Sequence, residues 1–406
     1  MTGGGLKEKG ATMDMGRTAR RRGLVRRLAA LACAAAMAAF VASCDAGDGN
    51  SGNGGHGDPG ETSAVAPSPV SSERAPGEEA ARGGGDGGGP ADDGKIRIGF
   101  SMDTLQEERW QKDRDMFKEA AEALGAEVVV MEANADDAKQ ISQAESMIGM
   151  GVDLLVVVPH NAEAMAAIVK KAHSAGIKVL SYDRLIKNSE VDFYISFDNV
   201  KVGELKAEAI TRLVPRGKYV YIGGADTDNN AHLLKEGVFN VLQPSIDRGD
   251  ITVVYDQWTK DWKPANALVN IQAALAANGN RIDAVIAGND AVAGSVVQAL
   301  SAAGLAGIVP VAGQDAELAG VQRIVEGTQT MTVYKPIRLL ADKAADLAVR
   351  MARGETVEAD RKVNNGKIEV PSVLLQPIAV DKRNIDGTVV ADGFHKREDV
   401  YKKPER

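Results

Sequence analysis

Acidic, amide and guanidinium side chains stand just after several apolar runs of this chain. They are Asp183 and Arg184, Asp228 and Asn230, Asn289, and Asp315. A buried parallel strand has a continuous apolar sequence, and open α/β sheets bind ligands beyond the carboxyl ends of such strands. We therefore expect these side chains to meet at one edge, in a site for a hydroxyl-rich small molecule. No nucleophile is visible among them, so we expect no catalytic residue and no enzyme.

A sugar would find the groups that it needs in this set. Its hydroxyls both donate and accept hydrogen bonds, and its C–H faces pack on aromatic rings. Arg109, Arg184 and Lys335 are donors, the aspartates are acceptors, and the two asparagines do both. Trp110 and Trp262 are the expected aromatic plates.

Each residue also has a purely structural explanation. An aspartate at a strand end often caps the next helix, which would account for Asp183 and Asp290. Arg109 would then be a solvated charge, and Trp262 would pack against the helix that begins near Pro264. Helix capping does not explain why arginine and tryptophan join the acids. If Trp262 is a binding plate, Trp262→Ala should weaken binding and leave the stability of the free protein nearly unchanged.

Composition excludes several classes of function. The net charge of −8 over 406 residues does not favour a nucleic-acid partner. Cys33 and Cys44 both precede the folded region, so we expect no disulfide framework and no catalytic thiol. The histidines lack metal-ligand spacing. Residues 226–237 begin like a calcium loop but have Ala231 and Gly237 where that loop needs glycine and glutamate. We expect no metal and no cofactor.

From Lys95 onward, apolar runs alternate with helical segments, which predicts an α/β fold with parallel sheets. Two such series predict two βα lobes joined by several crossings. The predicted boundaries are 95–200 plus 335–368 for the N-terminal lobe and 201–334 plus 369–406 for the C-terminal lobe. Short strands are expected at Val370–Leu375 and Asp386–Val390.

The first 94 residues are typical of export and tethering. Residues 1–44 have an arginine-rich start and a short apolar run, which predicts a signal peptide. The run ends in Val-Ala-Ser-Cys44, which resembles the bacterial lipoprotein box and predicts lipidation of Cys44. An ordinary signal peptide with an incidental cysteine is the alternative. Residues 45–94 contain no Leu, Ile, Met, Phe, Tyr or Trp, which predicts a disordered tether with an end-to-end distance of roughly 40 Å.

Long strings of the folded part resemble periplasmic sugar-binding proteins of the ribose/galactose type, and within them the proteins that bind D-xylose for an ABC transporter. The matching strings are Glu108–Arg114, Ser181–Arg184, Asp192–Asn199, Lys201–Glu204, Asp228–Asn230, Gly313–Ala316, Gly327–Pro336 and Asp392–Lys396. The resemblance implies a type I periplasmic-binding-protein fold, in which two Rossmann-like lobes with parallel sheets are joined by a multi-strand hinge and close around one pentose. It also implies that the sugar contacts are Arg109, Arg184, Asp228, Asn230, Asn289, Asp315 and Lys335, with Trp110 and Trp262 stacking on the ring and Asp183 beside it.

The resemblance implies a monomeric solute-binding protein that delivers D-xylose or a related monosaccharide to an ABC permease with its cytoplasmic ATPase. With the lipid on Cys44, we expect the protein on the outer face of the cell membrane or in the periplasm. A tethered sugar receptor for a membrane signalling kinase is one alternative, and a sugar-acting enzyme is another. A transcriptional repressor on the same scaffold would need a helix-turn-helix before the first strand, where this chain has the signal and the tether.

Overall fold

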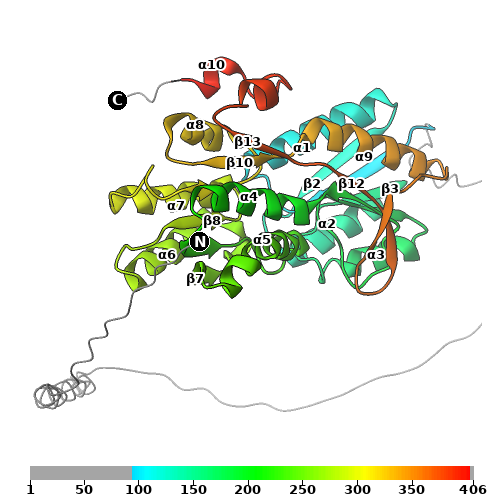
Figure 1. The fold of residues 1–406 in the computed structure, drawn as a ribbon. Coiled ribbons are helices and arrows are strands. Elements are labelled where there is room, and N and C mark those ends of the chain that lie inside the picture. Colours follow the sequence, from blue (N-terminus) through cyan, green and yellow to red (C-terminus); the bar gives the residue numbers. More distant parts are fainter. Residues whose placement is uncertain (1–93, 403–406) are drawn as a thin grey trace, which may run out of the picture. The chain divides into compact units, whose positions relative to one another are not determined.

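The computed structural model describes residues 94–402, which form two mixed sheets covered by helices (Figure 1). The predicted signal peptide, Cys44 and nearly all of the predicted tether lie outside the described residues. Between residues 94 and 402, no helix combines the length and apolar character needed to cross a membrane.

The first sheet contains seven strands, and all neighbours are parallel except β11 and β12. Their order is β11 (Arg361–Asn364), β12 (Glu369–Leu375), β5 (Phe193–Phe197), β4 (Lys178–Tyr182), β3 (Leu154–Val157), β1 (Arg97–Met102) and β2 (Glu127–Glu132). Helices α1 (Glu108–Ala123) and α9 (Ile337–Ala352) cover one face, and α2 (Asp137–Gly149) and α3 (Ala166–Ser174) cover the other. The buried side chains alternate between these two layers, as expected for strands covered on both faces.

The second sheet contains six strands, and only the pair β10 and β13 is antiparallel within it. The order is β13 (Ile378–Asp381), β10 (Met331–Tyr334), β9 (Val311–Ala312), β8 (Ala284–Ala287), β6 (Gly217–Ile222) and β7 (Ile251–Gln257). One face packs against α4 (Asn199–Leu213) and α5 (Asn229–Asp247), and the other against α6 (Pro264–Ala277) and α7 (Asp290–Ala302). The remaining elements are the 3₁₀ turn η1 (Lys260–Trp262), α8 (Leu318–Glu326), the helical turn η2 (Asp386–Val390) and α10 (Arg397–Val400).

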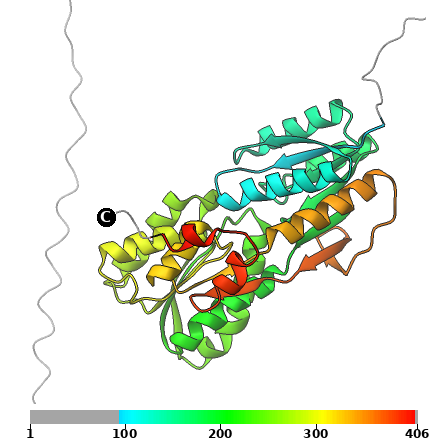
Figure 2. The ribbon, with the colours of Figure 1, turned by 90° about the horizontal axis from the view of Figure 1, so that it is seen from above.

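The chain passes between the sheets three times, which confirms the prediction of two lobes joined by several strands. It crosses from β5 to α4, from β10 to α9, and from β12 to β13. In Figure 2, the cyan and orange helices α1 and α9 lie together on the first lobe, away from the green and yellow elements of the second. The crossings between the lobes are short. The carboxyl ends of the strands in both sheets therefore face one shared space.

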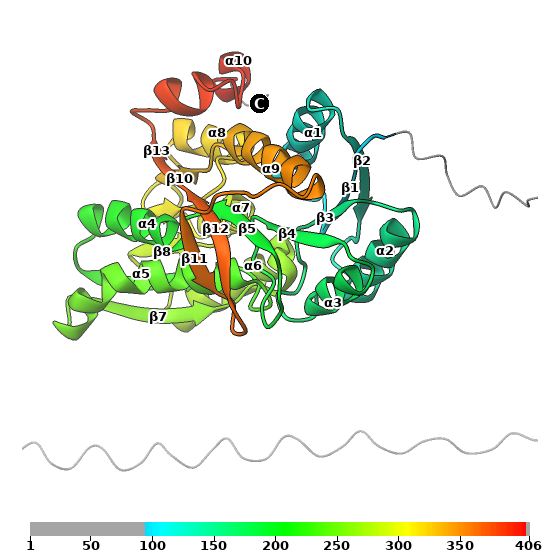
Figure 3. The same cartoon turned by 90° about the vertical axis from the view of Figure 1, so that its right-hand side faces the viewer.

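Two predictions about the tail differ from the structure. Residues 369–375 were expected in the second lobe, but β12 pairs with β5 in the first sheet, where Val370 and Val373 are buried (Figure 3). Asp386–Val390 was expected as a strand and instead forms the helical turn η2. Val389 packs there against Tyr334 and Phe394, so tertiary packing overrides the β-branched sequence.

Candidate ligand-binding site

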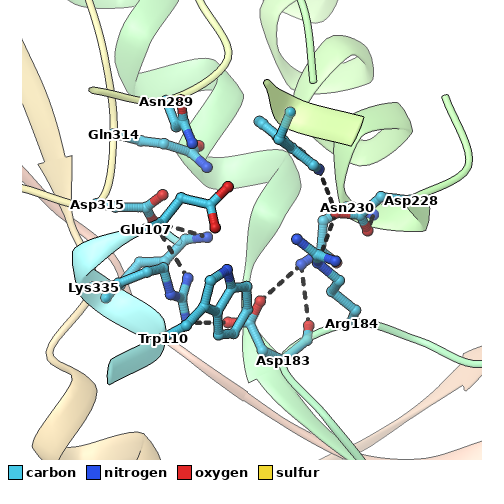
Figure 4. A pocket seen from close by; sticks show the side chains of 12 residues that line it. Glu107, Trp110, Asp183, Arg184, Asp228, Asn230, Asn289, Gln314, Asp315 and Lys335 are labelled. Atoms are coloured by element: carbon cyan, nitrogen blue, oxygen red, sulfur yellow. Dashed lines mark hydrogen bonds and ion pairs between the residues drawn. The ribbon is translucent and has the colours of Figure 1, made fainter. Parts of the chain in front are cut away.

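A pocket lies between the two lobes, where strands of both sheets end. The empty space among its lining residues, open solvent included, is about 330 Å³. Twelve residues line it: Glu107, Arg109, Trp110, Asp183, Arg184, Asp228, Asn230, Trp262, Asn289, Gln314, Asp315 and Lys335 (Figure 4). The structure thus brings together all ten residues that the sequence predicted for the site. Their role in binding stays a prediction.

Both lobes contribute to the lining. From the first lobe, Arg109 and Trp110 come from the first turn of α1, and Asp183 directly follows β4. From the second lobe, Asn289 caps α7 after β8, and its side chain accepts a hydrogen bond from the Val292 amide. Lys335 lies in the crossing between β10 and α9.

Arg109 connects the lobes through a buried cluster of carboxylates. Its guanidinium lies 3.1 Å from Asp113, 2.8 Å from Asp183 and 3.3 Å from Asp315, the last of which belongs to the second lobe. Burial raises the pKa of Asp183, but Arg109 and Lys335 outweigh this effect and hold the pKa below its usual value. Burial raises the pKa of Asp113 to about 6 even though Arg109 opposes it. Arg109 is therefore not the solvated charge of the alternative explanation.

Arg184 forms a second connection between the lobes. It lies 2.6 Å from Asp103 in its own lobe and 2.9 Å from Asp228 in the other. Asp228 also caps α5, because its side chain accepts from the Asn230 amide at 2.9 Å, and it accepts from the Trp262 indole at 3.1 Å. For Asp228 the capping role and the pocket role coexist.

Asp183 is not a helix cap, which settles one alternative left open by the sequence. Its carboxylate and its backbone carbonyl both accept from the Asn230 side-chain amide across the cleft, each at 3.1 Å. The hydroxyls of Tyr194 and Ser196 also donate to that carbonyl. Strand β5, which leads into one of the crossings, therefore fixes the orientation of the Asp183 backbone.

The two indoles belong to the core as well as to the pocket. Trp262 is 6% exposed, and a Cβ added at Gly224 would lie 2.1 Å from its ring, so the ring rests directly on backbone. Trp110 is also buried, and the guanidinium carbons of Arg109 and Arg184 lie 4.2 and 5.0 Å from its ring centroid. Contacts with other protein groups therefore hold both rings in place.

Three residues of the pocket lining have a left-handed backbone conformation, although none of them is glycine. The φ angles are 60° for Asp183, 57° for Trp262 and 83° for Asp315. Such conformations cost about 1–3 kcal/mol each and persist where the surrounding structure enforces them. Their concentration around one pocket indicates that side-chain direction there is fixed at the expense of local backbone preference.

Sequence reasoning missed Glu107 and Gln314. Within the described residues, Glu107 Oε2 and Gln314 Oε1 are buried without a hydrogen-bond partner, and so is Asn230 Oδ1. Figure 4 shows the Glu107 carboxylate and the Gln314 amide directed into the pocket. Glu107 precedes Glu108-Arg-Trp110 and Gln314 precedes Asp315, so adjacency to predicted residues was the available signal. Three free acceptors around one space suit a ligand that brings hydroxyl donors.

The charge of the lining disfavours an anion. The acidic residues are Glu107, Asp183, Asp228 and Asp315, and the basic ones are Arg109, Arg184 and Lys335. Both arginines are already paired with carboxylates. Among residues 94–402, no group of acidic, histidine or cysteine side chains could hold a metal ion. The geometry thus fits a neutral polyhydroxyl molecule.

Glu317 lies near the buried acids Asp290 and Asp315 and makes the stability of the protein depend on pH. Burial raises its pKa to about 9, and Asp290 and Asp315 act in the same direction. Between pH 4.5 and 9 the unfolded chain loses this proton while the folded protein keeps it, so stability falls as pH rises. Glu317→Gln should raise the unfolding free energy at pH 8 by about 1–3 kcal/mol and change it little at pH 5. Urea unfolding at both pH values measures this, with Glu326→Gln at the exposed end of α8 as the control. An equal effect at both pH values would contradict the prediction.

Two hinged lobes that enclose a polar pocket between parallel sheets define a bilobal solute-binding protein. The sequence pattern of the periplasmic binding protein domain matches residues 98–356. The chain belongs to the periplasmic binding protein family, and the predicted resemblance and type I fold are confirmed. Proteins of this kind bind solutes and are not enzymes.

Two similar proteins are the D-xylose-binding periplasmic proteins of Haemophilus influenzae and Escherichia coli. Each is 54% identical over 306 residues, covering 75% of this chain and 92% or 93% of the relative. A multiple sugar-binding periplasmic receptor of Rhizobium radiobacter is 34% identical over 75% of this chain and 92% of its own length. A solute-binding protein of Chloroflexus aurantiacus, solved with D-glucose, has a TM-score of 0.71 at 31% identity and covers 75% of this chain and 98% of its own.

Proposed function

We propose that this protein captures D-xylose, or a closely related neutral monosaccharide, outside the cytoplasm and delivers it to an ABC importer. The observation that carries the proposal is the pocket itself, in which two indoles and a ring of hydrogen-bonding groups from both lobes surround one small space. Support for xylose comes from the 54% identity to proteins named for D-xylose binding.

The proposed contacts are the ten predicted residues together with Glu107 and Gln314. Micromolar affinity requires about −8 kcal/mol, which several charge-assisted hydrogen bonds and two stacked rings supply. A ligand shifts the balance between open and closed forms only when it binds the closed form more tightly. A sugar that contacts Arg109 on one lobe and Asp315 on the other satisfies this condition. The closed form is then the form that a permease recognises.

Calorimetry against a panel of pentoses and hexoses tests the proposal. We expect D-xylose to bind with micromolar or tighter affinity, and L-arabinose, D-ribose and D-glucose to bind at least about tenfold more weakly, which is about 1.4 kcal/mol. No binding of any monosaccharide at millimolar concentration would contradict it. If another sugar binds more tightly, the ligand is still a monosaccharide, but D-xylose is not the preferred one.

A signalling receptor is a second candidate, because the 34% identical relative from Rhizobium radiobacter is named a receptor. Both roles use the same pocket. They differ in the partner that recognises the closed form, which is a permease for transport and a membrane kinase for signalling. Uptake of labelled xylose by cells that lack this protein separates them. Loss of uptake supports transport, and intact uptake with a lost transcriptional response supports signalling.

The proposed membrane attachment depends on Cys44, which follows the apolar run of the signal. Lipidation at this cysteine would place the folded part at the end of a tether of about 50 residues, roughly 40 Å from the membrane. Cys44→Ser should move the protein from the membrane fraction to the soluble fraction or the medium. Cys33→Ser is the matched control and should leave attachment unchanged. Membrane attachment of the Cys44 variant would contradict lipidation.

A further inference from the structure

Asp290 lies behind the pocket and does not line it. The side chain is fully buried and directly follows Asn289, a proposed sugar contact. The sequence left open whether Asp290 caps a helix. In the structure Asn289 caps α7, and the Asp290 carboxylate points elsewhere.

The Asp290 carboxylate accepts hydrogen bonds from two other segments of the second lobe. Its Oδ2 accepts from the Glu317 amide at 3.0 Å and from the Thr332 hydroxyl at 2.9 Å. Its Oδ1 accepts from the Gln329 side-chain amide at 2.7 Å. The Asp290 amide donates to the Gln314 carbonyl at 2.9 Å. One residue thus joins the start of α7, the loop 313–317 and strand β10, and each of these carries or borders a pocket residue.

The loop 313–317 depends on this support because its backbone is strained. Asp315 and Ala316 have φ angles of 83° and 50°, two successive left-handed residues without glycine. The Ala316 amide donates to Thr332 Oγ1 at 3.2 Å, and that hydroxyl in turn donates to Asp290. The strained conformation directs the Asp315 carboxylate toward Arg109 and Lys335, at 3.3 and 3.5 Å.

Two glycines leave room for the Asp290 carboxylate. A Cβ at Gly313 would lie 2.0 Å from Oδ1, and a Cβ at Gly320 would lie 2.3 Å from Oδ2. Loop and helix therefore approach the carboxylate closely from two sides. Such contact means that a small shift of Asp290 displaces the loop that carries Gln314 and Asp315.

We propose that Asp290 is a positioning residue for the sugar site: it holds the strained loop 313–317 so that Gln314 and Asp315 face the ligand. The inference rests on the proposed function and goes beyond it, because Asp290 acts through the loop and does not touch the sugar.

Asp290→Asn tests this positioning with almost no change in shape. An amide nitrogen in place of either oxygen meets a donor, because Glu317 and Thr332 donate on one side and Gln329 on the other. Rotation of the Gln329 amide does not relieve the clash, since Arg323 donates to Gln329 Oε1 at 3.0 Å and fixes its orientation. With the nitrogen toward Glu317 and Thr332, the variant loosens the loop directly. With the nitrogen toward Gln329, it displaces the Gln329 amide, which packs against Gly313 of the same loop.

We expect Asp290→Asn to bind D-xylose about tenfold or more weakly, measured by calorimetry at a temperature where circular dichroism shows the variant folded. Hydrogen exchange of residues 313–317 should become faster in the ligand-free variant. In an Asp315→Asn background, the further loss caused by Asp290→Asn should shrink to less than about threefold, because both changes act on the same contact.

Thr332→Val and Asp283→Asn complete the test. Thr332→Val removes the hydroxyl that links Ala316 to Asp290 and should weaken xylose binding in the same direction, which keeps the test available if Asp290→Asn does not fold. Asp283 directly precedes β8 and so lies at the amino-terminal ends of the strands, opposite the pocket. Its side chain accepts from the Lys218 amide and packs against Gly217. Asp283→Asn should leave xylose affinity within twofold of the wild type.

Wild-type affinity in both Asp290→Asn and Thr332→Val would overturn the positioning role. So would an equal loss from Asp290→Asn in the wild-type and Asp315→Asn backgrounds. A wild-type protein that binds no monosaccharide would overturn the proposed function and this inference together, so the two failures are distinguishable.

Discussion

Arg109→Met should abolish measurable binding of D-xylose and destabilise the free protein. The change leaves Asp113, Asp183 and Asp315 in a buried cluster without their shared cation. Removing one partner of a buried ion pair costs about 3–5 kcal/mol, because the remaining charge stays desolvated. It also removes a connection between the lobes that a closed form needs.

Urea unfolding and calorimetry measure the two effects of Arg109→Met. The loss of stability should be smaller at pH 5 than at pH 8, since carboxylates without the arginine have higher pKa values in the folded state and take up protons as pH falls. Arg338→Met is the matched control, because Arg338 pairs with Glu119 at the surface, where such pairs contribute about 0–1 kcal/mol. A stable Arg109→Met variant with wild-type affinity would contradict the role assigned to this residue.

Trp262→Ala should weaken xylose binding by about tenfold or more and also lower stability by about 3–5 kcal/mol. The second effect differs from the expectation based on sequence, in which the free protein was to remain nearly unchanged. The indole is buried against Gly224 and donates to Asp228, so its removal opens a cavity in the second lobe and takes one hydrogen bond from a buried carboxylate.

Trp258→Ala separates the two roles of Trp262. Trp258 is half-buried on the same lobe, next to Gly223, and does not line the pocket. It should lower stability and leave xylose affinity within about twofold. If Trp262→Ala lowers stability but keeps wild-type affinity, Trp262 is a core residue and not a binding plate.

The positions of the site residues could be predicted because strand ends are visible in sequence. The apolar runs before Asp183, Asn289 and Asp315 became β4, β8 and β9. Parallel pairing brings the ends of β8 and β9 together in the second sheet, and the pocket between the lobes adds the end of β4 from the first. The residue types and the order of strands and helices were sufficient to predict which side chains lie at the site. Glu107 was missed because it follows no strand directly and precedes a helix, where an acid is usually a cap.

Long-range pairing and backbone strain were not accessible in the same way. The sequence of β12 is compatible with either lobe, and its place beside β5 follows from the return of the chain after α9. The left-handed backbone of Asp315 and Ala316 depends on Thr332 and Asp290, which are distant in sequence. Local propensity therefore predicted the elements, and tertiary contacts set the direction of the side chains.

A crystal structure of the protein grown with D-xylose tests the central claim most directly. The account predicts density for one monosaccharide between the two lobes, in contact with Trp110 and Trp262, with its hydroxyls within hydrogen-bond distance of Glu107 and Gln314. Sugar density outside this cleft, or an empty cleft at saturating xylose, would contradict it.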